Sequence, residues 1–154
     1  IPQPTTSQET GTAVIPQTSL SSRSVSYSSA APDFTWPVNG EIIAPFGTSI
    51  RGVHNDGVNI AANAGDAVRA SQAGEVAFVG AGLKAFGNLV LVKHRGGWIT
   101  AYAHLGEVTV KEGDQLERGQ VIGVVGQTGR VDRPQLHFEI RKSREPVNPE
   151  DFLS

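Results

Sequence analysis

The sequence predicts an all-β domain, either a barrel or a sandwich, that follows a long linker. After residue 35, glycines interrupt short runs rich in Val, Ile and Ala, and 17 of the 18 glycines lie there. Regular interruption of this kind is typical of many short strands joined by turns. No segment keeps a 3.6-residue apolar period, so we expect little helix. The chain of 154 residues has no cysteine, and a domain above ~100 residues can bury a sufficient core without disulfides.

Residues 1–35 differ in composition from the rest of the chain. They hold 14 Ser and Thr, 4 Pro and only 3 charged side chains. Such a stretch has little to bury and indicates a flexible linker, so we place the domain at residues 36–154. Scattered apolar side chains could still let the linker dock on a surface: Val14, Ile15, Leu20, Val25 and Tyr27.

Eight short apolar runs, each bounded by turn residues, predict the strands of the domain. They are Val58–Ala62, Ala67–Ala70, Gly74–Val79, Asn88–His94, Trp98–His104, Val108–Val110, Gln120–Val125 and Gln135–Arg141. Gly96 and Gly97 predict a hairpin between two of these runs. The glycine-containing segment from Gly126 to Pro134 predicts a longer loop before the last strand.

Two segments of the domain resemble each other. Ala64–Val68 and Glu112–Leu116 both place a Gly-Asp turn before a glycine-led apolar run. The pattern fits either an ancestral duplication or the same turn chemistry used twice. A biotinyl- or lipoyl-type carrier would also use such repeats, but it presents a modifiable lysine at a hairpin tip, usually next to methionine. The chain has no Met, and no lysine lies at such a tip.

Composition excludes several function classes. The 13 Lys and Arg against 15 Asp and Glu give a formal charge of -2, which argues against nucleic-acid binding. The absence of cysteine excludes Cys-ligated zinc and Cys nucleophiles. No apolar run approaches the ~18 residues of a membrane span. Because the chain begins at Ile1 rather than Met, we expect a processed form or an excised piece.

Four histidines are the first candidates for chemistry: His54, His94, His104 and His137. Period-two alternation in the last predicted strand separates two faces. Leu136, Phe138 and Ile140 form the predicted core face, and Gln135, His137 and Glu139 face a groove or solvent. The run from Trp98 similarly delivers His104 to a strand end.

Seven segments together carry a family resemblance. They are Gly52–Ala62, Tyr102–Leu105, Gly113–Asp114, Gly119–Gly123, Gly126–Gly129, Leu136–Arg141 and Pro146–Pro149. They resemble the lysostaphin-like (LytM-type) zinc peptidases, which cleave peptidoglycan cross-links, over nearly all of the predicted domain. The resemblance implies an antiparallel β-sandwich or split barrel, of the duplicated hybrid-motif kind, around a central groove walled by loops.

The zinc motifs of that family are altered in this chain. The family binds zinc through H-x-x-x-D in the first motif and the second His of H-x-H in the last strand. Aligned on Gly57, the first motif has Asn55 and Asn59 at its ligand positions, and Gln135 replaces the first, catalytic His of H-x-H. His137 keeps a ligand position, and His104 keeps the other catalytic position. Amides are poor zinc ligands, and glutamine has no nitrogen lone pair to act as a base.

The resemblance therefore implies no zinc, no other cofactor and no catalytic residue. One alternative is a working zinc endopeptidase with shifted ligands, in which His54 and Asp56 join His137. It requires a bulge that swings His54 inward, and it still leaves Gln135 where the base should be. The plainer interpretation of Asn55-Asp56-Gly57 is a turn.

The altered motifs resemble a degenerate subgroup of the EnvC, NlpD and DipM type, which activates cell-wall amidases. This implies that the chain binds and activates a periplasmic N-acetylmuramoyl-L-alanine amidase of a diderm bacterium during division and daughter-cell separation. The partner groove would comprise Asn55, Asn59, His104, Gln135 and His137, with a basic rim of Arg130, Arg133 and Arg141.

Three alternatives remain open at this stage. The arginines could be an ordinary charged surface. The domain could be a non-catalytic peptidoglycan-binding module. The linker could occupy the groove of its own chain or of a neighbouring one.

Overall fold

The computed structural model describes residues 32–50 and 52–154, and Asp33–Ser154 forms one compact unit. Twelve strands follow in chain order: β1 Glu41–Ala44, β2 Ser49–Ile50, β3 Val53–His54, β4 Val58–Ala61, β5 Ala67–Arg69, β6 Gly74–Gly80, β7 Asn88–Lys93, β8 Trp98–Val108, β9 Gln115–Leu116, β10 Val121–Val125, β11 Gln135–Lys142 and β12 Glu145–Val147. Within the described residues, helix is limited to two 3-10 turns, Arg95–Gly97 and Pro149–Asp151, and no helix is long and apolar enough to cross a membrane. The prediction of an all-β domain is confirmed.

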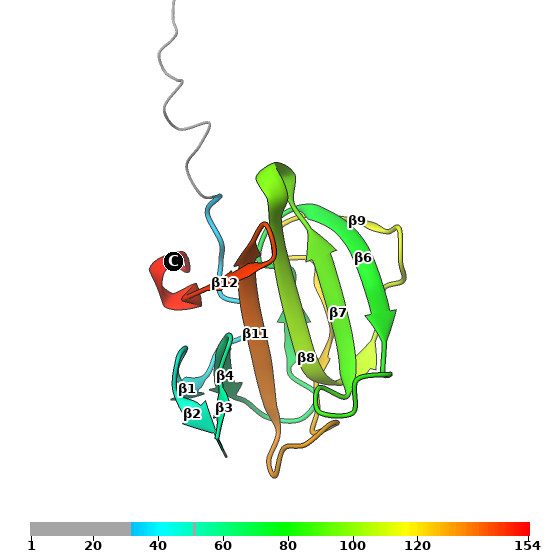
Figure 1. Ribbon diagram of the computed structural model, residues 1–154. Coiled ribbons are helices and arrows are strands. Elements are labelled where there is room, and N and C mark those ends of the chain that lie inside the picture. The colour runs from blue at the N-terminus through cyan, green and yellow to red at the C-terminus, as the bar shows by residue number, and fades with distance from the viewer. Residues whose placement is uncertain (1–31, 51) are drawn as a thin grey trace, which may run out of the picture. The chain divides into compact units, whose positions relative to one another are not determined.

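Ten of the strands form one antiparallel sheet. Its main path is β1-β4-β11-β8-β7-β6-β9, while β10 joins β5 to β8, and β12 pairs with β11 (Figure 1). β2 and β3 form a separate hairpin. The predicted hairpin at Gly96 and Gly97 is confirmed as the β7–β8 connection. β11 lies between β4 and β8, so its side chains share each face of the sheet with side chains from both of these strands.

The alternation predicted for β11 is confirmed. Leu136, Phe138 and Ile140 are fully buried, and the Phe138 ring packs 5.3 Å from the ring of Tyr102 on β8. Burying an aromatic side chain of this size contributes ~2–3 kcal/mol through apolar area alone. This face anchors β11 in the core, so its opposite face is held rigidly toward the groove.

Seven of the eight predicted strands coincide with observed ones. The prediction of a strand at Val108–Val110 is wrong, because Val108 ends β8 and Thr109 instead donates its N–H to Ile122 in an irregular turn. The short strands β1, β2, β3, β9 and β12 carry no apolar alternation long enough to predict them. Each has two to four residues and depends on the partner strand beside it.

The structured part begins slightly before residue 36. Phe34 is fully buried, with its ring 5.5 Å from His94 and 5.8 Å from Trp98. Thr35 donates its N–H to Ser71 at 2.9 Å, and Ser154 donates to the carbonyl of Phe34 at 3.0 Å. The predicted docking of the linker concerns residues that lie outside the described ones.

A chain of buried polar groups begins at His94, just after β7. Its Nδ1 lies 2.7 Å from the Ala73 carbonyl oxygen, and its Nε2 lies 2.8 Å from the Thr100 hydroxyl. The Thr100 and Tyr102 hydroxyls are 2.9 Å apart, and Ser71 donates its N–H to Tyr102 at 2.9 Å. Hydroxyl protons rotate, so a neutral His94 protonated on Nδ1 lets tyrosine donate to threonine and threonine donate to Nε2. Burial lowers the pKa of His94, against the opposing effect of the Ala73 carbonyl, and raises the pKa of Tyr102 to about 12.

These buried polar groups lead us to expect that the free energy of unfolding of the domain falls in mild acid. Because the folded pKa of His94 is lowered, the unfolded chain binds more protons below about pH 6.5. The stabilisation is therefore complete above the unfolded pKa and is lost as pH falls through the folded value. Urea unfolding between about pH 8 and about pH 5 should show a shallower pH slope for His94→Gln, by at most about 1.4 kcal/mol per pH unit. An identical slope in the variant would contradict a buried neutral His94.

Candidate functional site

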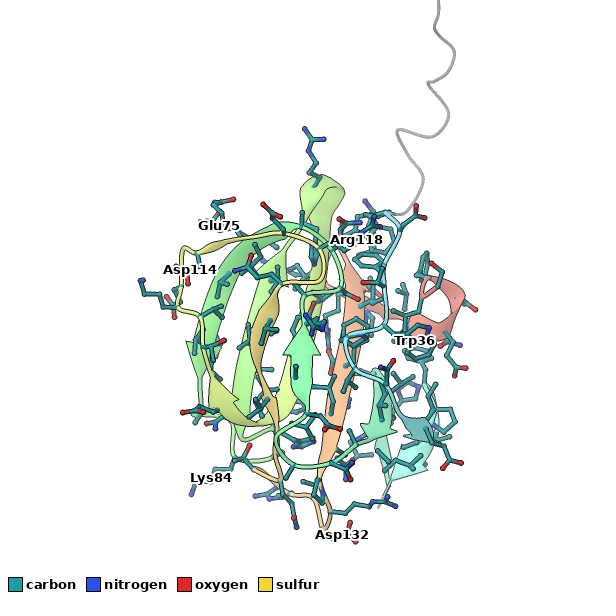
Figure 2. The ribbon with its side chains drawn as sticks, turned by 180° about the vertical axis from the view of Figure 1, so that it is seen from behind. Trp36, Glu75, Lys84, Asp114, Arg118 and Asp132 are labelled. Atoms are coloured by element: carbon teal, nitrogen blue, oxygen red, sulfur yellow. The ribbon has the colours of Figure 1, made fainter. Side chains whose placement is uncertain are left out.

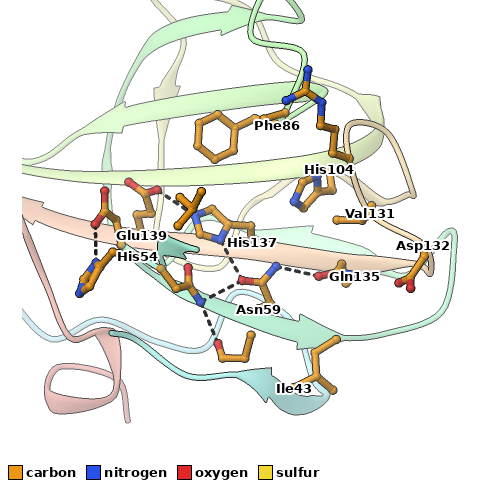
Figure 3. Close-up of a pocket in the computed structure, with 16 residues that line it drawn as sticks. Ile43, His54, Asn59, Phe86, His104, Val131, Asp132, Gln135, His137 and Glu139 are labelled. Atoms are coloured by element: carbon orange, nitrogen blue, oxygen red, sulfur yellow. Dashed lines mark hydrogen bonds and ion pairs between the residues drawn. The ribbon is translucent and has the colours of Figure 1, made fainter. Parts of the chain in front are cut away.

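A groove of about 710 Å³ runs across the face of the sheet opposite the core (Figure 3). β11 and β4 form its floor, and its walls come from β1, β3 and the loops before β7 and β11. Those two loops lie at the same end of the domain, as Lys84 and Asp132 show in Figure 2. The structure brings all five predicted groove residues together in its lining: Asn55, Asn59, His104, Gln135 and His137.

The three predicted rim arginines occupy different positions. Arg130 lines the groove, and Arg141 lines a smaller pocket that adjoins it. Arg133 contributes its carbonyl oxygen, which accepts a hydrogen bond from Gln135 at 3.2 Å. A basic rim therefore stays a prediction for Arg130 and Arg141. Arg133 lines neither cavity.

Strand register sets the floor of the groove. His137 on β11 lies directly opposite Asn59 on β4 and opposite Ala103 on β8. Directly opposite residues in an antiparallel pair project to the same face with Cβ atoms about 5 Å apart. The contact between Asn59 and His137 is thus a consequence of strand pairing.

Backbone partners fix the orientation of two amides. Asn55 donates from Nδ2 to the carbonyls of Ala44 at 3.1 Å and Pro45 at 3.3 Å, while its Oδ1 accepts from the N–H of Gly57 at 3.3 Å. Gln135 donates from Nε2 to the Arg133 carbonyl. Neither amide can be reversed without facing a donor toward a donor or an acceptor toward an acceptor.

These two amides determine the orientation of the third. Asn59 donates from Nδ2 to Gln135 Oε1 at 2.7 Å, and its Oδ1 accepts from Asn55 Nδ2 at 3.2 Å. The same Oδ1 lies 3.1 Å from Nδ1 of His137. Since this oxygen can only accept, His137 carries a proton on Nδ1 and donates it to Asn59.

The other ring nitrogen of His137 faces a carboxylate. Nε2 lies 2.8 Å from Glu139 Oε2, and Arg141 donates from Nε to Glu139 Oε1 at 2.7 Å. Burial raises the pKa of Glu139, but the hydrogen bonds and positive charges of His137 and Arg141 outweigh burial, so the net pKa is lowered. Glu139 is therefore ionised, and both ring nitrogens of His137 are engaged, one by Asn59 and the other by Glu139.

His104 lies beside this network in an unusual backbone conformation. Its φ is 65°, in the left-handed region, and the side chain is only 4% exposed. Nδ1 lies 2.8 Å from the Thr128 carbonyl, to which it donates. Burial lowers the pKa of His104; the Thr128 carbonyl opposes this, and the positive charge of His137 adds to it. The ring is therefore neutral and has a lone pair on Nε2.

The expectation that His104 ends a strand is wrong, because β8 continues to Val108. β8 pairs with β11 as far as Ala103 and with β10 from Leu105, so it changes partner at His104. Gly126 donates its N–H to the His104 carbonyl at 3.1 Å, and His104 donates its N–H to Phe86 at 2.8 Å. The left-handed residue lets the strand make this change.

Three site residues were missed or undervalued by sequence reasoning. Phe86 stacks on the His137 ring with centroids 5.5 Å apart. Glu139 and Arg141 complete the charged chain that ends at Asp56, 3.4 Å from Arg141. The alternation in β11 already placed Glu139 on the groove face, but nothing in the sequence revealed the stacking of Phe86.

The donor set does not fit the zinc that the family resemblance implies. Within residues 32–50 and 52–154, no three His, Asp or Glu side chains are grouped to hold a metal. Neutral amides occupy two ligand positions, and at the third both ring nitrogens of His137 are already engaged by Asn59 and Glu139. The shifted set is not assembled either, since His54 pairs with Asp56 at 3.0 Å and both are exposed, while His137 is bonded to Asn59 and Glu139.

Comparisons with known proteins support the resemblance seen in the motifs. Residues 53–149 match the model of Peptidase family M23. The cell division protein DipM of Caulobacter vibrioides is 48% identical over 122 residues, which cover 75% of this chain and 20% of DipM. The lipoprotein NlpD/LppB homolog of Pseudomonas aeruginosa is 40% identical over 124 residues, covering 80% and 41%.

Two further similarities concern function and fold. The murein hydrolase activator NlpD of Escherichia coli is 39% identical over 118 residues, covering 77% of this chain and 30% of NlpD. The catalytic domain of lysostaphin from Staphylococcus simulans superposes with a TM-score of 0.64 at 30% identity, covering 73% and 89%. The chain thus spans between 20% and 41% of the length of these three sequence relatives. The predicted family and fold are confirmed.

Proposed function

The chain belongs to peptidase family M23, and on that premise we propose that it is a catalytically inactive member that activates a cell-wall amidase. The proposed partner is a periplasmic N-acetylmuramoyl-L-alanine amidase that acts during cell division and daughter-cell separation. The groove formed by β4, β11 and their loops is the proposed binding surface. The domain would act by binding and would catalyse no reaction itself.

One observation carries the proposal, the closed hydrogen-bond network at the positions of the family's ligands. Asn55, Asn59 and Gln135 satisfy one another, and His137 is engaged on both nitrogens. A catalytic zinc site needs about three anionic or lone-pair ligands and an open position for water. The network offers neither a set of three such ligands nor an open position for water. The groove above it nevertheless has a volume of about 710 Å³.

The relatives support a murein hydrolase as the partner, the class to which the proposed amidase belongs. One is a cell division protein and another a murein hydrolase activator. We place the murein hydrolase outside this domain, because amides replace two zinc ligands of the family at positions 55 and 59 and its catalytic histidine at position 135. The lipoprotein relative supports a place in the cell envelope, and we assign this chain to the periplasm of a diderm bacterium.

Activation follows from differential binding. A groove that binds a segment of the amidase only in the amidase's open form shifts its population toward that form. Moving a partner from 1% to 99% open requires about 5.5 kcal/mol of differential affinity. A groove with apolar walls and a fixed polar floor can supply an interaction of that size without any conformational change of its own.

An assay of dye release from labelled cell walls tests the proposal. The chain alone should release no dye, an amidase of the same bacterium alone should release little, and the mixture should release at least about tenfold more. Chelator added to the chain before dialysis should not change the stimulation. Dye release by the chain alone would indicate a working endopeptidase. Sedimentation of the chain with insoluble walls, without stimulation of any amidase, would favour a peptidoglycan-binding module.

A further inference from the structure

A second, smaller pocket adjoins the groove and has a different chemistry. It has a volume of about 170 Å³ and is lined on one side by Leu83, Phe86, Leu89, Leu91 and Ala101. His137 and Glu139, together with Phe86, line both cavities, so the pocket opens beside the polar floor. We call this cavity the side pocket.

The side pocket is suited to an uncharged apolar group. Its polar end is formed by His137, Glu139 and Arg141. Glu139 is bonded to His137 and Arg141, and Arg141 also pairs with Asp56 at 3.4 Å, so each charge at this end already has a partner within the domain. A volume of about 170 Å³ is below the roughly 300–1,000 Å³ of small-molecule sites, so one large side chain suits it better than a cofactor.

The side pocket has a buried base and an exposed mouth. Leu89 and Ala101 lie at its base and are 6% and 5% exposed, whereas Leu83 at its mouth is 56% exposed. Phe86 and Leu91 pack against this base. An apolar side chain inserted here would cover Leu83 and would lose its own contact with water, which is how anchor residues contribute to interfaces.

His104 supplies an independent sign of a ligand in the same groove. The residue is only 4% exposed, and Nε2 has no hydrogen-bond partner among the described residues. A buried acceptor without a partner costs free energy unless a ligand satisfies it. Left-handed residues other than glycine persist where the surroundings fix them, often at ligand sites. The rings of His104 and Phe86 both lie against His137, at 6.1 and 5.5 Å.

We infer that the groove recognises an uncharged segment of the amidase that places a large apolar side chain in the side pocket and a neighbouring N–H or O–H donor on His104 Nε2. The inference rests on the proposed function for the identity of the partner. The two subsites surround the same imidazole, so a single short segment can reach both. The apolar wall of the side pocket lies outside the family's ligand and catalytic positions, whereas His104 keeps one of the catalytic positions.

A fragment titration tests the side pocket without any amidase. N-acetyl-L-leucinamide carries a large apolar side chain and neutral N–H donors, and N-acetylglycinamide is the matched fragment without the side chain. In NMR spectra of the full chain, the leucine fragment should give saturable shifts at Leu83, Phe86 and Leu91, and the glycine fragment should not. Ala101→Leu fills the pocket from its base and should abolish the shifts. Shifts that persist in this variant, or that are absent from the unmodified chain, would overturn the inference.

Affinity for the amidase tests the same pocket in the proposed complex. Ala101→Leu should weaken binding at least about tenfold, and Leu83→Ala by several fold. Val121→Ala, an equally conservative change at an exposed position on β10, should have no effect. Thermal unfolding of each variant excludes loss of fold, and Leu83→Ala is the safer variant because its side chain is exposed. Unchanged amidase affinity in both pocket variants would overturn the inference while leaving the proposed function intact.

Paired substitutions isolate the acceptor on His104. His104→Asn tolerates the left-handed backbone and keeps a donor for the Thr128 carbonyl, but it cannot reach into the groove. His104→Gln places an oxygen near the position of Nε2 and should recover part of the affinity that His104→Asn loses. Equal affinities for both variants and the unmodified chain would contradict the acceptor role. If the chain binds no amidase but still binds the leucine fragment, the proposed function fails and the side pocket stands.

Discussion

Replacing Asn55 by His, Asn59 by Asp and Gln135 by His in one chain is expected to create a zinc site that the unmodified chain lacks. The first two changes supply an imidazole and a carboxylate beside His137. The third change is needed because a carboxylate at position 59 would face the acceptor oxygen of Gln135, which now accepts from Asn59 at 2.7 Å. Binding of zinc would require the coordinating ring nitrogen of His137 to be free of its proton, while the other nitrogen keeps its N–H.

The size of this effect follows from the ligand set. We expect a zinc dissociation constant below about 1 μM for the triple variant, which corresponds to more than about 8 kcal/mol of binding free energy. Equilibrium dialysis followed by elemental analysis measures it. The triple variant with an added His137→Gln change is the matched control and should lose the metal. If the triple variant holds no more zinc than the unmodified chain, the geometry of the groove, as well as its residue types, differs from that of a zinc peptidase.

Replacing Glu139 by Ala is expected to cause the largest loss of stability among changes in the groove. The Glu139 side chain is 7% exposed, and it accepts from His137 at 2.8 Å and from Arg141 at 2.7 Å. Hydrogen bonds to charged groups contribute about 1.5–3 kcal/mol each. We therefore expect the free energy of unfolding to fall by about 3 kcal/mol, and Tm by ~10 °C.

Arg141→Ala provides the comparison for this measurement. Its side chain is 32% exposed, and its second ion pair, with Asp56 at 3.4 Å, is accessible to solvent. Pairs of this kind contribute less than about 1 kcal/mol. Urea unfolding should therefore rank Glu139→Ala well below Arg141→Ala in stability. Equal losses in the two variants would mean that the bond between His137 and Glu139 contributes little.

The β11 strand illustrates what the sequence alone could predict. Its alternation of polar and apolar residues correctly placed His137 toward the groove and Phe138 toward the core, because the period of a strand is fixed. The family motifs placed Asn59 and Gln135 near His137. The hydrogen bond between His137 and Asn59 could not be predicted, since the orientation of Asn59 depends on Asn55 being oriented by the carbonyls of Ala44 and Pro45.

Features that depend on backbone far away in the chain could not be predicted from the sequence for the same reason. β1 is an edge strand of four residues, and nothing in its pattern showed that its end would orient the amide of Asn55. His104 matched a family motif, yet its left-handed conformation arises where β8 exchanges β11 for β10. The side pocket depends on Leu83 and Phe86, in the loop before β7, lying near the side chains of β7. A sequence pattern does not predict this arrangement.

Calorimetric titration of the unmodified chain with zinc tests the central claim most directly, since the proposed binding function depends on a groove that holds no metal. The titration should give no more heat than the same titration of the His137→Gln variant, because amides occupy two ligand positions and both ring nitrogens of His137 are already hydrogen-bonded. One zinc ion bound tightly per chain, and lost in the His137→Gln variant, would contradict the account.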